Sequence, residues 1–95
     1  MNRKAKGARS ERRARDILKD LGYDLVIKAG GSLGVFDLIG LSCEYDHAIL
    51  LQIKTNRRPG KFEMDLLRFF QVPKFCRKEL WVFKDRVKSP EIIEL

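Results

Sequence analysis

The sequence predicts a single small α/β domain over residues 1–95, in which helices flank a mixed central β-sheet. Three observations predict this class. Apolar residues recur at helical spacing near the N-terminus, two nearly continuous apolar runs follow, and a second helical pattern separates these runs from a further apolar run. A chain of 95 residues has room for one domain only, and a second copy could complete so small a core.

The first expected element is a helix. Its apolar positions Ala14, Leu18 and Leu21 recur at helical spacing, and Gly22 ends the pattern. Ser10 could cap this helix, or the basic residues before it could already be helical. The next expected element is a first strand, Tyr23–Lys28, which the glycines at positions 30, 31 and 34 bring to an end.

Two central strands are expected next, at Val35–Leu41 and Ala48–Lys54. Both runs are almost wholly apolar, which is typical of strands that are covered on both faces. The polar segment Glu44–Asp46 between them predicts a tight turn and hence an antiparallel hairpin. A loop at 57–60, a helix at 62–70 that stops near Pro73, a strand at 80–83 and a short edge strand at 91–95 complete the expected order.

The chain carries twenty Lys and Arg against thirteen Asp and Glu, a net charge of +7, and a domain this basic is expected to bind a polyanion. The charge is concentrated at the N-terminus and in the loop around position 58. A solvated basic face is the alternative, but two clusters that flank one candidate site favour nucleic acid. The residues predicted to contact nucleic acid are Arg9, Arg12, Arg13, Lys28, Arg57, Arg58 and Lys61.

Composition excludes several other classes. No apolar run approaches the ~20 residues that span a bilayer, and no apolar segment follows the basic N-terminus as in a secretory signal. We therefore expect no membrane partner and a cytoplasmic location. His47 is the only histidine, which rules out a multi-histidine zinc site and favours a structural role. Cys43 and Cys76 form no metal-binding motif and are expected to be reduced and partly buried.

Three polar residues interrupt the two central strands: Asp37, Gln52 and Lys54. A charge buried in a sheet needs a partner, a metal or solvent. If the hairpin turns at 44–46, the antiparallel register places Asp37 opposite Gln52 or Lys54. Gln52 and Lys54 share one face of their strand, whereas Ile53 points the other way, into the core. The three polar groups should therefore meet at one end of the hairpin.

Glu11 is the only acid among the N-terminal arginines, and its spacing from Ala14 and Leu18 puts it on the apolar face of the helix. It could join the polar site, or it could be a surface residue that pairs with Arg15. Carboxylate and amide oxygens suit Mg²⁺ or Mn²⁺, and such a metal can activate water against a phosphodiester. Lys54 could help to activate this water or stabilise developing charge, or it could simply form an ion pair with Asp37.

The helix with Glu11, the segment GGSLGVFDLIG and the segment LLQIKTNRR together resemble the PD-(D/E)XK nuclease superfamily, over about residues 7–75. The pattern is most similar to archaeal and viral Holliday junction resolvases. The resemblance implies a restriction-endonuclease-like fold, with Glu11 and Asp37 as site carboxylates and with Gln52 and Lys54 in place of the ExK motif. The predicted metal ligands are Asp37, Gln52, Ile53 and Glu11. Ser32 matches a site serine of these resolvases, although it could be an ordinary turn serine.

The glutamine in QIK departs from ExK and should weaken metal binding, although some branches of the family also carry QxK. Three functions therefore remain open. The first is a metal-dependent Holliday junction resolvase, the second is a related nuclease that acts on another DNA substrate, of the nicking or mobile-element type, and the third is a catalytically inactive DNA-binding module.

A homodimer is expected, because paired cuts in a four-way junction need two sites. An apolar set should remain partly exposed as its interface, or else all of it fits one core. The set comprises Leu66, Leu67, Phe69, Phe70, Val72, Phe75, Trp81 and Phe83.

Overall fold

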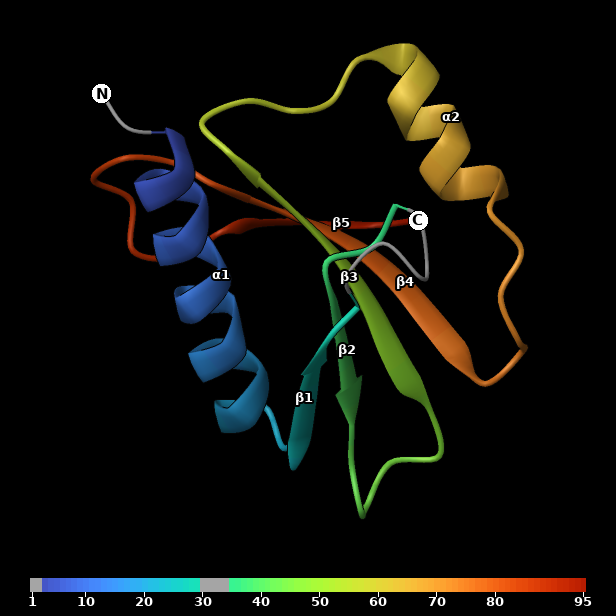
Figure 1. Ribbon diagram of the computed structural model, residues 1–95. Coiled ribbons are helices and arrows are strands. Elements are labelled where there is room, and N and C mark those ends of the chain that lie inside the picture. Colours follow the sequence, from blue (N-terminus) through green and yellow to red (C-terminus); the bar gives the residue numbers. More distant parts are fainter. Residues whose placement is uncertain (1–2, 30–34) are drawn as a thin grey trace.

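The computed structural model describes residues 3–29 and 35–95. The elements are α1 (Arg3–Asp20), β1 (Leu25–Lys28), β2 (Leu38–Leu41), β3 (Ala48–Thr55), α2 (Lys61–Phe69), β4 (Cys76–Phe83) and β5 (Glu91–Glu94). The strands form one mixed sheet in the order β1-β2-β3-β4-β5, where β3 and β4 run parallel and the other neighbours run antiparallel (Figure 1). The predicted α/β class with a mixed sheet between helices is confirmed.

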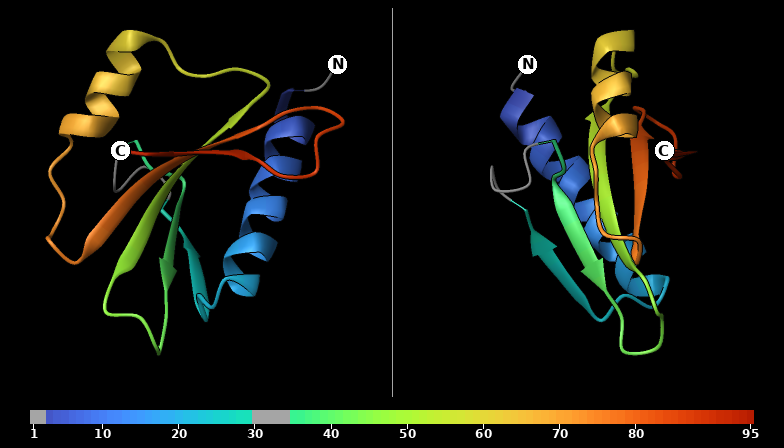
Figure 2. Two further views of the ribbon diagram at one scale, coloured as in Figure 1. Left: turned by 180° about the vertical axis from the view of Figure 1, so that it is seen from behind. Right: turned by 90° about the vertical axis from the view of Figure 1, so that its right-hand side faces the viewer.

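The two helices cover different faces of the sheet, as the views from behind and from the side show (Figure 2). Side chains alternate along β3, so Ile49 and Leu51 join the core beneath α1 while Leu50 packs with Leu67 of α2. The core beneath α1 is the larger of the two and includes the fully buried Trp81. This two-sided cover explains why the central strands are almost continuously apolar.

Ser10 lies inside α1, so of the two alternatives the second is confirmed: the basic residues before Ser10 are already helical, and Ser10 does not cap the helix. Ser10, Ala14 and Leu18 follow one another at a spacing of four residues and are all buried on the side that faces the sheet. The buried Ser10 hydroxyl is satisfied by the Thr55 hydroxyl at the end of β3, with Oγ 2.9 Å from Oγ1. This bond ties the start of the helix to the carboxyl end of the central strand.

Two strands begin three or more residues away from their predicted starts. The regular pairing of β2 begins at Leu38, three residues later than expected, although the Asp37 N–H still donates to the Leu51 carbonyl at 2.8 Å. β4 begins at Cys76, four residues earlier than expected. Its charged first half pairs with β3 through the backbone, which requires no apolar side chains, and buried Glu79 is satisfied there by the Trp81 indole N–H at 2.9 Å.

The apolar set expected at a dimer interface divides in two. Trp81 and Phe83 are fully buried beneath α1, so they belong to the core and not to the part of the set that stays exposed. They share a face of β4, but it is the face covered by the first helix and not by the second. Leu66, Phe69 and Phe75 are indeed exposed, with 79% of Phe69 accessible, and Phe62 is exposed beside them. Leu67 alone of the α2 residues is buried.

His47 has the structural role expected of it, since its Nε2 lies 2.7 Å from the Tyr23 hydroxyl and its ring stacks on Tyr45. Cys76 is a partly buried free thiol, whereas Cys43 is exposed, contrary to the prediction. The reason is its place in the exposed turn between β2 and β3, where its backbone N–H donates to Asp24. Over residues 3–29 and 35–95, no helix has the length and apolarity needed to cross a membrane.

Candidate functional site

Asp37 lies just before β2 and is held by three hydrogen bonds. Its N–H donates to the Leu51 carbonyl, its carbonyl accepts from the Ala29 N–H at 2.9 Å, and its Oδ2 accepts from the Ile53 N–H at 2.8 Å. The register pairs Leu38 with Leu51, which places Asp37 opposite Gln52, as the hairpin geometry predicted. The carboxylate is therefore fixed at the seam between the two central strands.

The environment of Asp37 disfavours its charged form. Burial is the main cause that raises the pKa of this carboxyl, and the nearby Glu11 carboxylate adds to it. The Ile53 N–H and the ammonium groups of Lys54 and Lys28 act in the opposite direction without cancelling the effect. A partly buried carboxylate beside a second carboxylate is the arrangement that an added cation would relieve.

Glu11 faces Asp37 across a cleft of about 390 Å³ between α1 and the sheet. The Glu11 carboxylate also lies 3.7 Å from Arg15 and 3.8 Å from Lys28. The two alternatives for Glu11 are therefore compatible, because this residue pairs with Arg15 and also lines the cleft. The cleft is lined by Gly7, Ala8, Glu11, Lys28, Asp37, Ile53 and Thr55. Thr55 was not among the predicted site residues, since a threonine at a strand end carries no distinctive signal.

Gln52 is buried against the Asp37 carboxylate and the Val35 carbonyl. Both of these neighbours can only accept hydrogen bonds, so the NH₂ group of the Gln52 amide faces them as the donor. In this orientation the amide nitrogen lies 3.0 Å from Asp37 Oδ2. In this orientation the amide steadies Asp37 as a donor. The amide must turn by half a rotation before its oxygen can bind a cation beside Asp37.

Lys54 is directed to α2 and away from the cleft. Its Nζ lies 2.7 Å from the carboxylate of Glu63, in the first turn of that helix. Lys54 and Gln52 share the α2 face of β3, whereas Ile53 and Thr55 face α1, as strand alternation predicted. Lys54 is still close enough to Asp37 to lower the pKa of that carboxyl. No sequence pattern indicated Glu63, because its contact depends on where α2 packs.

The predicted nucleic-acid contacts fall into two groups. Arg9, Arg12, Arg57 and Lys61 are exposed, and Lys28 is exposed at the edge of the cleft. Arg13 is half-buried and Arg58 is exposed, and both guanidinium groups make hydrogen bonds within the chain. The Arg13 guanidinium donates to the carbonyls of Val87 (3.0 Å) and Lys88 and lies 4.9 Å from the centre of the Phe83 ring.

Arg58 forms a two-pronged ion pair with Glu91, which raises the pKa of the arginine and lowers that of the glutamate. A structural role therefore competes with nucleic-acid contact at both Arg13 and Arg58. The predicted site residue Ser32 lies outside the described residues, as do the glycines around it.

The donor set suits a hard divalent cation. Asp37 and Glu11 supply carboxylate oxygens to one cleft, and Ile53 also lines it. Because the Ile53 N–H points to Asp37, the carbonyl of the same residue points to that side of β3 as well. Among the described residues no group of three or more His, Cys, Asp or Glu could hold a metal, so a cation here needs backbone oxygens and water besides the two carboxylates.

The fold and the cleft define a small α/β domain with a five-stranded mixed sheet and an acidic pair in a cleft edged by Lys28. No family model, no curated protein and no solved structure matches the chain.

Proposed function

We propose that this protein is a metal-dependent, structure-selective DNA endonuclease, in which Asp37 and Glu11 hold Mg²⁺ or Mn²⁺ and the substrate is a four-way junction. The observation that supports this proposal is the Asp37 carboxylate. It is held at 2.8 Å by the Ile53 N–H, its pKa is raised by burial and by Glu11, and it opens into a cleft edged by Lys28. A carboxylate kept in so unfavourable a setting is typical of a functional site.

Mg²⁺ bound by Asp37, Glu11 and the Ile53 carbonyl would polarise a phosphodiester and lower the pKa of a bound water. The side chains contribute charge and position. Asp37 is oriented by the Ile53 N–H and by the Gln52 amide, so that its second oxygen is left for the cleft. Lys28 and Arg15 offset the charge of Glu11 and provide positive charge for a phosphate that enters.

Lys54 is proposed to stabilise the negative charge that develops on the phosphate, as the resemblance implies. In this structure the Lys54 ammonium lowers the pKa of Asp37 and forms an ion pair with Glu63 at 2.7 Å. Both side chains of the pair are about a third exposed, so the pair contributes no more than about 1 kcal/mol and can be exchanged for contact with substrate. The Lys54 side chain would then turn from α2 toward Asp37.

A second candidate is a DNA-binding module without catalysis. Two observations favour it: the Gln52 amide is placed as a donor to Asp37, and Lys54 is paired with Glu63. Both residues are thus satisfied without a metal or a substrate. A nuclease for another duplex substrate shares the first proposal's chemistry and differs from it only in the DNA that is cut.

The test is cleavage of four-way junction, flap, duplex and single-stranded DNA, each with Mg²⁺, Mn²⁺ or EDTA. We expect metal-dependent cutting of the junction, lost in Asp37→Asn and kept in the control Asp46→Asn, which changes an exposed aspartate in the β2–β3 turn. Cutting of duplex or flap in place of the junction would select the other nuclease substrate. DNA binding without cleavage in any metal would select the inactive module.

A further inference from the structure

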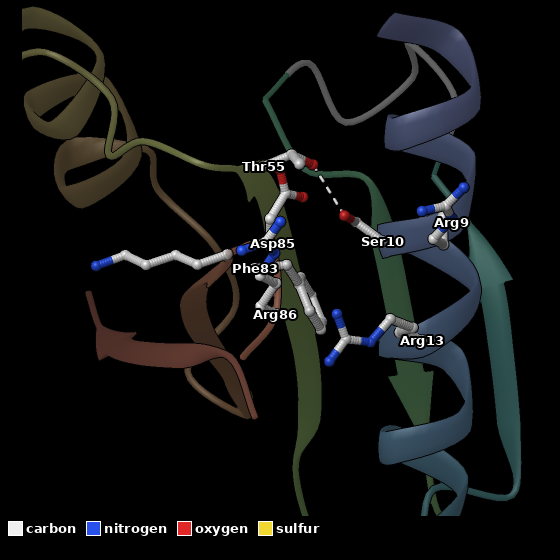
Figure 3. A pocket seen from close by; sticks show the side chains of 8 residues that line it. Arg9, Ser10, Arg13, Thr55, Phe83, Asp85 and Arg86 are labelled. Carbon is white, nitrogen blue, oxygen red and sulfur yellow. Dashed lines mark hydrogen bonds between the residues drawn. The ribbon is translucent and has the colours of Figure 1, made fainter. Parts of the chain in front are cut away.

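A second, smaller pocket shares Thr55 with the Asp37 cleft. It lies between α1 and the strand ends (Figure 3). Its volume is about 100 Å³, and it is open to solvent on one side, so a small anion can enter it. The pocket is lined by Arg9, Ser10, Arg13, Thr55, Phe83, Lys84, Asp85 and Arg86.

The lining is strongly cationic. Four of the eight residues are Arg or Lys and one is an acid, Asp85, whose carboxylate accepts from the Asn56 amide at 3.2 Å. The Arg13 guanidinium is held against the Phe83 ring and the Val87 and Lys88 carbonyls, so its charge is fixed in place (Figure 3). Fixed cations at a small cavity lose little side-chain freedom when an anion binds.

Two hydroxyl groups complete the wall. Ser10 and Thr55 face each other across the gap between α1 and β3, with their oxygens 2.9 Å apart (Figure 3). One hydroxyl donates its hydrogen in this bond, and the hydrogen of the other remains available as a donor. The pocket thus offers a neutral donor as well as charge, as phosphate sites commonly do.

The pocket stands at the carboxyl ends of β3 and β4, the one parallel pair in the described sheet. Ligands of open α/β sheets bind at this end of the strands. The loops that leave the two strands are joined there: the Asn56 N–H donates to the Phe83 carbonyl at 2.7 Å, and the Asp85 N–H donates to the Asn56 side-chain oxygen at 2.9 Å.

Arg86 follows this junction with a φ of 65°, in the left-handed region that side chains rarely adopt. A glycine would adopt this conformation without cost. Residues held in strained backbone conformations cluster at ligand and active sites. At position 86, the arginine contributes a cation to the pocket.

We propose that this pocket binds a backbone phosphate of the same DNA strand whose neighbouring phosphate occupies the Asp37 cleft. Thr55 lines both cavities, so a strand that crosses the end of β3 passes from one to the other. The pocket then fixes the register of the strand relative to the acidic pair. That the ligand is a DNA strand rests on the proposed function, whereas that the pocket binds a phosphate group rests on its geometry and charge.

The test is Arg86→Gly, which removes the cation and relieves the left-handed strain, so the variant is expected to fold at least as well as the wild type. Its DNA affinity is measured against salt in EDTA, where no cleavage is required. We expect weaker binding and a salt slope lower by about 0.9, the value for one lost duplex phosphate contact. The matched control is Lys74→Gly, which removes an exposed cation before the opposite end of β4.

If the salt slope falls equally in Arg86→Gly and Lys74→Gly, the effect is one of net charge and the proposal is wrong. An unchanged salt slope in Arg86→Gly would also overturn it. Inorganic phosphate provides the second arm. Inorganic phosphate could stabilise the wild type against unfolding more than it stabilises Arg86→Gly, while both proteins bind DNA equally well. In that case the pocket binds free phosphate, and the proposed contact with a DNA strand is wrong. If the slope falls but no DNA is cut with any metal, the pocket proposal stands and the endonuclease proposal fails.

Discussion

Asp37 is held in an environment that disfavours its charge, and this has a measurable effect on stability. Burial and Glu11 raise the pKa of Asp37 in the folded chain above its ordinary value of 3.8. The protonated form is therefore favoured by folding, and the contribution of Asp37 to stability is largest below pH 3.8 and is lost as the pH rises through the folded pKa. Near neutral pH the ionised carboxylate lowers the free energy of unfolding.

The substitution Asp37→Asn should therefore stabilise the fold near pH 7, on the order of 1 kcal/mol as for other strained functional groups. The side-chain oxygen of the introduced asparagine would still accept from the Ile53 N–H, so the local geometry is kept. Denaturant unfolding at pH 7 and pH 3 measures this, and the gain should vanish at pH 3. A loss of stability at pH 7 would show that the carboxylate is a structural group.

Gln52 gives a test of the metal proposal that does not depend on cleavage. Gln52→Glu adds a further carboxylate beside Asp37 and near the Val35 carbonyl, and the repulsion should lower the melting temperature without metal. Mg²⁺ should then raise the melting temperature of this variant more than that of the wild type. In Gln52→Ala, Mg²⁺ should have no larger effect than in the wild type. Equal metal responses in Gln52→Glu and wild type would place the cation away from residue 52.

At the scale of elements, α1 is fastened to the sheet at more than one point along its length. Ser10 and Arg13 contact the carboxyl end of β3 and the loop after β4, and the Arg15 guanidinium donates to the Val26 carbonyl of β1 at 3.3 Å. Since Glu11 lies on the same helix, these contacts also set the distance between Glu11 and Asp37. The basic helix thus has a structural function as well as an electrostatic one.

Arg13→Ala should lower the free energy of unfolding by about 1–3 kcal/mol, because it leaves the Val87 and Lys88 carbonyls without this donor and removes the contact with Phe83. The matched control is Arg12→Ala, which removes the same charge from the exposed side of the helix and should change stability by less than about 0.5 kcal/mol. Urea unfolding of both variants measures the difference. Equal stabilities would mean that the Arg13 contacts are too solvated to matter.

At the scale of the whole molecule, the surface around α2 is apolar and exposed. The helix buries Leu67 but leaves Phe62, Leu66 and Phe69 accessible, and Phe75 of the following loop is exposed as well. Apolar side chains gathered in this way are typical of an interface. A two-fold homodimer through α2 would give the paired sites that junction cleavage needs, and it remains a prediction.

Sedimentation at micromolar concentration should show a wild-type dimer and a monomeric Phe69→Asp variant. Phe69 is 79% exposed, so this change does not disturb the core. The control is Leu21→Asp, which introduces the same charge at an exposed apolar residue after α1 and should leave the dimer intact. A wild type that sediments as a monomer, with or without junction DNA, would rule out paired cutting by this chain alone.

The elements and their local pairing could be predicted from the amino-acid sequence. Helical spacing predicted the helix that carries Glu11. The apolar runs and the turn between them predicted that Asp37 lies opposite Gln52 or Lys54, and the register of the structure places it opposite Gln52. These features depend on residues close together in the chain, where the period of a helix or strand determines which side chains are neighbours.

The contacts that the site and core side chains make with other elements could be seen only in the tertiary structure. Lys54 forms an ion pair with Glu63 of α2. The side chains of Trp81 and Phe83 pack beneath α1, and Arg13 donates to a carbonyl 74 residues away in the sequence. Such contacts follow from how helices pack on the sheet, and no periodicity in the sequence encodes that packing. The pocket between α1 and the strand ends could not be predicted from the sequence for the same reason. Its walls come from the start of α1 and from the ends of β3 and β4, which become parallel neighbours only because the chain crosses over through α2.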